Sequence, residues 1–219
     1  MKPTILRFIC LVLPMFHPLL ASEQEAANPS NCSAESVPHE RLSAQLKESL
    51  DCIDTLASKW AENQTASVLD SLNTAIKVLQ KHHKTACTEP HPKRCGNPMV
   101  HSKGGLVCVT MGDVRYCKPM CNEGYDFAFL RRSRLYEHCK AGNKTSWSTQ
   151  YIGGKRLADC NKSTIQIAGA KSAYFPEGQD CLKTKSESDL ERNITRIFVS
   201  ELQSTGIQGV PEYKCLICG

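Results

Sequence analysis

Apolar residues recur at helical spacing through residues 36–84, a segment with no glycine and with Pro38 as its single proline. Side chains three or four positions apart share one face of a helix, so this recurrence predicts amphipathic helices. Pro38 suits a first helical turn, and the basic run at residues 81–84 suits a helix C-terminus. The apolar positions form two stripes, which are Leu42, Leu46, Leu50, Ile53 and Trp60, then Val68, Leu69, Leu72, Ile76 and Leu79.

Two features separate these stripes. Asn63, in the sequence AENQT, begins an N-glycosylation signal and needs an exposed position. Ser67 followed by Asp70 resembles a capping box, which marks the start of a helix. We therefore expect two antiparallel helices that pack on each other and on the next module. The alternative is that the stripes form a partner-binding face, as in a cytokine.

The character of the chain changes in residues 87–160, where helical periodicity vanishes and seven cysteines occur. In the stretch LVCVTMGDVRYCK, the pair Gly112 and Asp113 predicts a two-residue hairpin turn. That register puts Cys108 opposite Cys117 at a non-hydrogen-bonded position, where the Cα atoms are close enough for a disulfide. It gives one apolar face and one mixed face, with Val109, Met111, Val114 and Tyr116 on the first and Cys108, Thr110, Arg115 and Cys117 on the second.

A third pattern occupies residues 161–219. TIQIAGA predicts a strand, the stretch from Asp189 to Gln203 predicts a helix that Gly206 can stop, and YKCLIC predicts a second strand. The helix has one apolar face, made of Leu190, Ile194, Ile197, Phe198 and Leu202. These elements indicate a small α+β unit.

Within this unit, Cys181 is expected to pair with Cys215 or Cys218. The closed loop of about 35 residues would contribute roughly 3–4 kcal/mol in the chain-entropy model.

The N-terminus and the cysteine count indicate export. Lys2 and Arg7 precede an apolar run and then the small residues at positions 21 and 22, which is the pattern of a signal peptide. Removing it takes away Cys10 and leaves twelve cysteines, enough for six disulfides. No later apolar run is long enough to span a bilayer, so we expect no membrane anchor.

Glycosylation signals support the same route. Five N-x-Ser/Thr sites without proline at x exceed what chance would give, and each marks an exposed position. The sites are Asn31, Asn63, Asn143, Asn161 and Asn193.

Charge is segregated along the chain. Residues 23–76 carry 3 basic and 9 acidic side chains, residues 77–160 carry 15 and 6, and residues 161–219 carry 7 and 7. A basic middle attracts sulfated polysaccharide, anionic headgroups or an acidic protein, and nucleic acid is not expected outside the cell. The alternative is ordinary solvated charge. The candidate anion-binding residues are Lys81, Lys84, Lys93, Arg94, Arg131, Arg132 and Arg134.

From Cys95 to Cys160 the chain resembles a sushi, or complement-control-protein, module. The resemblance rests on CGNP at its start, CNEGYDF in the middle, Cys139, and TSWS ahead of the last cysteine. It implies the pairs Cys95–Cys139 and Cys121–Cys160, and a buried Trp147.

The segment also departs from that family. Cys108 and Cys117 are additional, the interval between Cys139 and Cys160 is long, and Cys87 competes with Cys95 as the first cysteine of the module. An unrelated small disulfide-rich β module is therefore the alternative.

Catalytic chemistry has no visible motif. The chain lacks G-x-S-x-G, H-E-x-x-H and a phosphate-binding glycine loop, so we expect no enzyme, no catalytic residues and no cofactor. The C-x-x-C of Cys215 and Cys218 lies in a strand-like tail instead of at a helix N-terminus, which favours a structural role. The scattered histidines do not form a predicted metal site.

These patterns together predict a disulfide-rich α+β protein. Its parts are a signal peptide (1–22), a helical hairpin (23–86), a sushi-like β module (87–160) and a small α+β unit (161–219). The expected function is binding to an extracellular protein or a sulfated polysaccharide, and the alternative is a soluble cytokine-like ligand acting through the helices. The pairing of Cys32, Cys52 and Cys87 and the oligomeric state stay open.

Overall fold

The chain divides into two units in a computed structural model, Met1–Thr65 and Ala66–Gly219. The structure describes residues 39–83, 87, 92, 95–96, 98–100, 103–140, 142, 146–149, 156–157 and 159–219. The predicted signal peptide lies outside these residues, so it stays a prediction.

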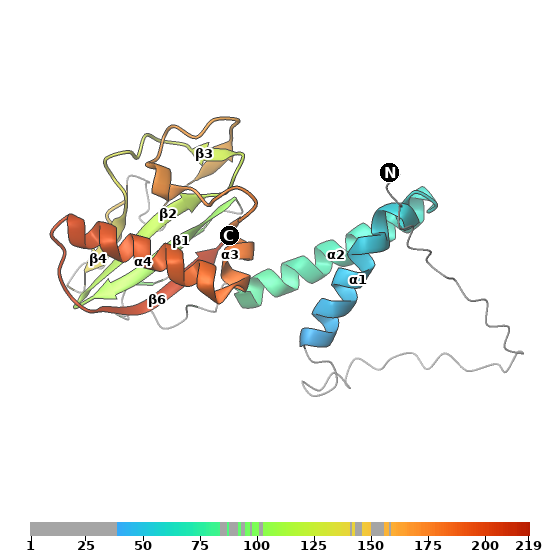
Figure 1. The fold of residues 1–219 in the computed structure, drawn as a ribbon, viewed down its shortest axis with the longest axis horizontal. Coiled ribbons are helices and arrows are strands. Elements are labelled where there is room, and N and C mark those ends of the chain that lie inside the picture. The colour runs from blue at the N-terminus through green and yellow to red at the C-terminus, as the bar shows by residue number, and fades with distance from the viewer. Residues whose placement is uncertain are drawn as a thin grey trace, which may run out of the picture. The chain divides into compact units, whose positions relative to one another are not determined.

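Two helices precede the sheet, α1 (His39–Ala57) and α2 (Glu62–His83), as the apolar stripes predict (Figure 1). The capping box at Ser67 is wrong, because α2 begins five residues earlier. There the backbone N–H of Ala61 donates to Oε1 of Gln64 at 2.9 Å, so a glutamine side chain provides the acceptor for an N–H group at the start of the helix. Neither helix contains a buried side chain within these bounds, and packing of one stripe on the other stays a prediction. None of the described helices is long and apolar enough to cross a membrane.

The second unit contains a four-stranded antiparallel sheet in the order β4-β2-β1-β6. Its central hairpin has the predicted register, with Met111 opposite Val114 and Cys108 opposite Cys117. Gly112 has a φ of 61°, which the tight turn requires and which glycine adopts without strain. The strands are β1 (Gly104–Met111), β2 (Val114–Cys121), β4 (Glu137–Lys140) and β6 (Pro211–Cys218).

The C-terminal residues belong to this sheet and do not form a separate unit. β6 pairs with β1, from Met111 opposite Pro211 to Gly105 opposite Cys218. A boundary between residues 160 and 161 is therefore wrong. The physical reason is that β1 has two edges to satisfy, and β2 fills only one of them.

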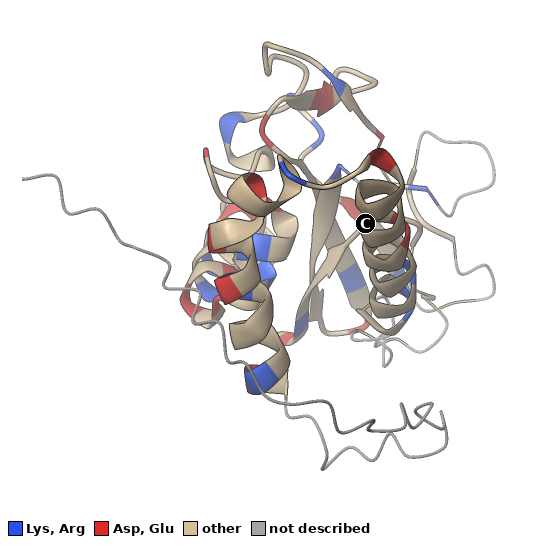
Figure 2. Cartoon of the chain, turned by 90° about the vertical axis from the view of Figure 1, so that its right-hand side faces the viewer, with Lys and Arg blue, Asp and Glu red and all other residues tan. Residues whose placement is uncertain are grey.

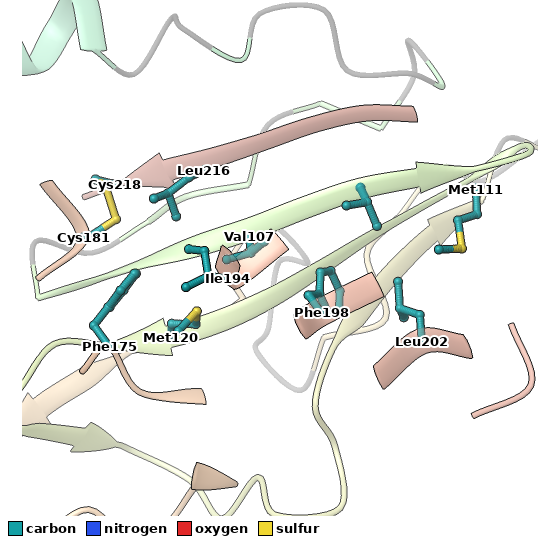
Figure 3. Close-up of a cluster of buried hydrophobic side chains, with 11 residues drawn as sticks. Val107, Met111, Met120, Phe175, Cys181, Ile194, Phe198, Leu202, Leu216 and Cys218 are labelled. Atoms are coloured by element: carbon teal, nitrogen blue, oxygen red, sulfur yellow. A yellow bond between two sulfur atoms is a disulfide. The ribbon is translucent and has the colours of Figure 1, made fainter. Parts of the chain in front are cut away.

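Helices α3 (Cys181–Ser186) and α4 (Ser188–Ser204) follow, and α4 packs on one face of the sheet (Figure 1). The predicted face of α4 supplies Ile194, Phe198 and Leu202 to the core, while Ile197 stays 39% exposed. Figure 3 shows these side chains meeting those of the strands. The shared core comprises Val107, Val109, Met111, Met120, Phe175, Cys181, Ile194, Phe198, Leu202, Leu216 and Cys218.

A second cluster of buried residues includes side chains from β1, β2, β4 and β6 together with Trp147, whose Nε1 donates to the carbonyl of Gly96 at 3.2 Å. Its members are Cys87, Cys95, Leu106, Cys108, Cys117, Cys139, Trp147, Leu157 and Ile217. The predicted burial of Trp147 is confirmed.

Four disulfides cross-link this unit. Of the two partners left open for Cys181, the structure selects Cys218. In the hairpin, the Cα atoms of Cys108 and Cys117 are 4.1 Å apart, as expected for a non-hydrogen-bonded pair. The bonds are Cys95–Cys139, Cys108–Cys117, Cys121–Cys160 and Cys181–Cys218.

Another part of the described chain forms a small lobe, defined as residues 122–132 and 159–174. It contains the two-stranded sheet of β3 (Tyr125–Phe127) and β5 (Cys160–Lys162), and the short helix η2 (Lys171–Ala173). The predicted strand at TIQIAGA is wrong, because side chains accept from its backbone N–H groups: Asp126 of β3 binds those of Ile167 and Ala168, and the hydroxyl of Tyr174 binds that of Gly169.

Candidate functional site

The basic residues of the middle segment do not all face solvent. Arg131 is buried, and its Nη1 lies 2.9 Å from Oε1 of the fully buried Glu137. Arg134 is half-buried, and its Nη2 lies 2.6 Å from the other oxygen of the same carboxylate. Placing Arg131 in an exposed anion-binding surface is therefore wrong, because it is buried against a carboxylate of opposite charge. Arg134 is 35% exposed but binds the same carboxylate, which offsets one of the two positive charges.

Lys118 is another internal cation. It is buried, and its Nζ lies 2.6 Å from Oε2 of Glu201 in α4. Burial lowers the pKa of Lys118, although the hydrogen bond and charge of Glu201 act against that shift. Part of the basic excess in residues 77–160 is thus structural, a point that residue counts cannot reveal.

Of the other candidate cations, Lys81 and Arg132 are exposed. The remaining three, Lys84, Lys93 and Arg94, lie outside the described residues. Lys and Arg are interspersed with Asp and Glu over the described parts of the chain (Figure 2).

The small lobe is organised around one carboxylate. Asp126 accepts hydrogen bonds from the backbone N–H of Phe127 at 2.8 Å, of Ile167 at 3.0 Å and of Ala168 at 3.1 Å. The hydroxyl of Tyr174 donates to the same side chain at 2.5 Å. Burial acts to raise the pKa of Asp126, but these four bonds outweigh it and lower the pKa.

The same contact alters Tyr174. Its burial and its hydrogen bond to Asp126 raise the pKa of the phenol to about 12. Both groups are therefore locked as donor and acceptor at neutral pH, and they hold residues 167–168 against β3.

Two loops of the small lobe present apolar side chains to solvent. The backbone N–H of Arg131 donates to the carbonyl of Ala168 at 2.5 Å, and Nε of Arg132 donates to the carbonyl of Ile167 at 3.0 Å, so the loops adjoin. Their exposed apolar residues are Phe129, Leu130, Ile165 and Ile167, with exposed fractions from 47% to 75%. Clustered exposed apolar residues mark binding surfaces.

Basic side chains accompany this apolar surface. Arg132, Lys162 and Lys171 are exposed in the lobe, and Nζ of Lys103 lies 5.5 Å from the ring centre of Tyr125. Glu123 is the exposed acidic residue among the lobe's described residues. Reasoning from the sequence missed this surface, although the run FAFL beside RRSR, outside any periodic pattern, was the available signal.

A groove of about 540 Å³ between α4 and β6 provides a second basic surface. Arg192, Arg196 and Lys214 line it and are exposed, and Val199 contributes apolar surface. The sequence analysis did not single it out, because the three cations are dispersed and balanced by acidic neighbours along the chain.

Three glycosylation signals lie in the described residues. Asn63, Asn161 and Asn193 are exposed, which the addition of a glycan requires. Asn31 and Asn143 lie outside the described residues.

No protein-family model, curated protein or solved structure matches the chain. The two implied pairings, Cys95–Cys139 and Cys121–Cys160, are present. They agree with the resemblance to sushi modules but do not establish membership of that family.

Proposed function

We propose that the protein is a secreted, N-glycosylated binding protein that contacts an acidic extracellular partner through the small lobe. The observation that carries the proposal is the exposed group Phe129, Leu130, Ile165 and Ile167 on a frame held by Asp126. The four disulfides and the apolar run behind Lys2 and Arg7 support the extracellular setting.

The partner's chemistry follows from the lobe's own. Exposed apolar side chains fit a protein surface better than a polysaccharide, because they gain free energy only when they leave water. Arg132, Lys162 and Lys171 favour a partner with negative charge. The loops also need little ordering on binding, since Asp126 already holds one of them to β3.

A binding titration of the labelled protein on intact cells tests the proposal. The labelled, glycosylated protein is expected to bind saturably, and the Leu130→Ser variant, which removes an apolar residue 75% exposed, is expected to bind at least about fivefold more weakly. Val210→Ser is the matched control, because Val210 is 76% exposed but lies outside the lobe. Glycosylated protein is used because Asn161 belongs to the same lobe.

Heparinase treatment of the cells identifies the class of partner. Binding that survives the enzyme and needs Leu130 supports an acidic protein. Binding that the enzyme abolishes, and that Arg132→Ala and Lys162→Ala weaken, identifies a sulfated polysaccharide. Arg131 and Arg134 are unsuitable for this experiment because their charges lie in an internal ion-pair cluster.

If cell binding is instead lost when Arg192 and Arg196 are replaced, the contact surface is the groove between α4 and β6. Equal binding by all lobe variants would overturn the small lobe as the contact surface.

A second candidate is signalling through the helices. Their apolar stripes are exposed in α1 and α2, including Leu50 at 63% and Leu79 at 62%. Removing residues 39–83 would then abolish cell binding while the lobe variants bind normally. The first candidate predicts the opposite pair of results.

A further inference from the structure

Two further cysteines, Cys87 and Cys215, lie in or against the same buried cluster of the sheet. Cys87 is buried, and its Sγ lies 3.9 Å from the backbone carbonyl of Leu216. Cys215 packs against the buried cluster that contains Cys87 and Ile217, and Cys215 and Ile217 point to the same face of β6. Residues far apart in sequence thus bring Cys87 and Cys215 to one face of this strand.

Positive charge adjoins this pair. Nη2 of the buried Arg115 donates to Sγ of Cys215 at 3.2 Å, and Lys185 acts on the same thiol through its charge. The hydrogen bond from Cys87, together with Arg115 and Lys185, outweighs burial and lowers the pKa of Cys215 to about 7. The hydrogen bond and burial raise the pKa of Cys87.

We propose that Cys87 and Cys215 close into a fifth disulfide during secretion, joining the chain just after α2 to the edge strand β6. The packing of both side chains in one cluster on β6, the approach of Cys87 to the backbone of Leu216 and the guanidinium beside Cys215 carry the proposal. The cysteine count agrees with it. Twelve cysteines follow the predicted signal peptide, eight of them form the four disulfides between described residues, and Cys87 and Cys215 are two of the other four.

The oxidant is a protein disulfide of the oxidoreductase class that operates in the secretory pathway. The Cys215 thiolate attacks one sulfur of that disulfide, forming a mixed disulfide and releasing the other sulfur as a thiolate. Cys87 then loses its proton and attacks Sγ of Cys215, which forms the new bond and releases the oxidant's first sulfur. Two electrons and two protons pass to the oxidant, which becomes a dithiol.

The roles of the two cysteines differ for a physical reason. Cys215 is only partly buried and accepts a hydrogen bond from Arg115, so it is the more accessible nucleophile of the two. Cys87 is buried and resolves the mixed disulfide from inside. The resulting bond ties the chain to β6 four residues beyond the end of α2 at His83.

Tryptic mapping of the full secreted chain tests the proposal. Cleavage after lysine yields three relevant peptides, which are residues 85–93 with Cys87, residues 172–183 with Cys181, and residues 215–219 with Cys215 and Cys218. Protein alkylated with N-ethylmaleimide and digested without reductant is expected to give all three peptides as one species, which reduction separates. Cleavage after Leu216 with chymotrypsin then divides Cys215 from Cys218 in the wild-type protein.

Two matched variants assign the bonds. Cys215→Ser is expected to release residues 85–93 and keep residues 172–183 attached to the C-terminal peptide, and Cys218→Ser is expected to do the reverse. N-ethylmaleimide on both Cys87 and Cys215 in the wild-type digest would overturn the proposal. So would Cys215 linked to Cys108, which lies opposite it in the sheet.

Discussion

At the scale of single residues, buried carboxylates set the shape of the sheet unit's loops. Asp126 binds three backbone N–H groups and a tyrosine hydroxyl, and Glu137 sits between Arg131 and Arg134. Each carboxylate joins segments that no strand pairing connects. Removing either charge therefore leaves buried donors without an acceptor.

Asp126→Asn tests the first carboxylate. Because an amide offers one acceptor oxygen and brings two unwanted donors, we expect a loss of about 1–3 kcal/mol in the free energy of unfolding. Guanidinium denaturation at neutral pH measures it. Asp113→Asn is the control, because Asp113 is exposed and lies 3.8 Å from Lys140, and its replacement should have little effect.

The pH dependence gives this prediction a second readout. The pKa of Asp126 is lowered in the folded chain, so its stabilising effect is full above the ordinary carboxyl pKa of 3.8 and is lost as pH falls below it. The difference between wild type and Asp126→Asn should therefore shrink on acidification. A difference that stays constant down to pH 2 would contradict the assignment.

Glu137→Gln tests the second carboxylate. Glu137 is fully buried, and neutralising it leaves the buried Arg131 without its counter-charge, so we expect a loss of roughly 3–5 kcal/mol. Thermal denaturation monitored by near-UV circular dichroism measures it. Glu212→Gln, which changes an exposed residue of β6, should leave the midpoint unchanged.

At the scale of elements, α4 illustrates how a local pattern becomes a packed interface. Its periodicity predicts one apolar face, and the structure buries the middle of that face against β1 and β2. Phe198 is completely buried and Ile197, its neighbour, is 39% exposed. Both residues are helical and apolar, but only Phe198 faces the sheet and is packed in the core.

Phe198→Ala should cost about 3–5 kcal/mol of unfolding free energy, because it leaves a cavity between α4 and the sheet. Ile197→Ala should cost less, about 1 kcal/mol, since Ile197 is 39% exposed and does not belong to the buried cluster between α4 and the sheet. Urea denaturation of both variants measures the difference. Equal losses would mean that α4 does not cover the sheet as described.

Elements differed in how far the sequence could predict them. The hairpin of β1 and β2 was predictable because alternation and the Gly112 turn are local signals. The place of β6 at the edge of the sheet was not, because strand pairing across a hundred residues has no local signature. The absence of a strand at residues 164–170 was equally hidden, since Asp126 competes for the N–H groups from elsewhere in the chain.

The candidate site divides in the same way. The hairpin register identified Cys108–Cys117 and the family resemblance implied Cys95–Cys139 and Cys121–Cys160, while the partner of Cys181 was left open between Cys215 and Cys218. It could not separate Arg131, which is buried, from Arg132, which is exposed. Neighbouring arginines in a basic run cannot be assigned as buried or exposed until the position of Glu137 is known.

At the scale of the whole molecule, the chain combines helices that expose their apolar stripes with a sheet unit that contains the cores. The three clusters of buried residues draw their members from residue 87 onward. No side chain within the bounds of α1 or α2 belongs to them. Folding of residues 84–219 should therefore not require α1 or α2, although residues 66–83 of α2 belong to the same compact unit.

A secreted chain that begins at residue 84 tests this independence. It should unfold in one cooperative transition, with a midpoint lowered by less than about 5 °C, which corresponds to roughly 1 kcal/mol. Differential scanning calorimetry measures it against the full chain. Loss of the cooperative transition would show that the helices support the sheet unit's core.

The amino-acid sequence by itself determined the two N-terminal helices, the central hairpin with its Cys108–Cys117 pair, and the helix α4. These features depend on periodicity, turn chemistry and spacing, which act over a few residues. Only the tertiary structure decided that β6 joins the sheet, which arginines are internal, and that Cys181 pairs with Cys218. Those outcomes depend on burial and contact between distant segments, where free energy is set by what surrounds a group and not by its neighbours in sequence.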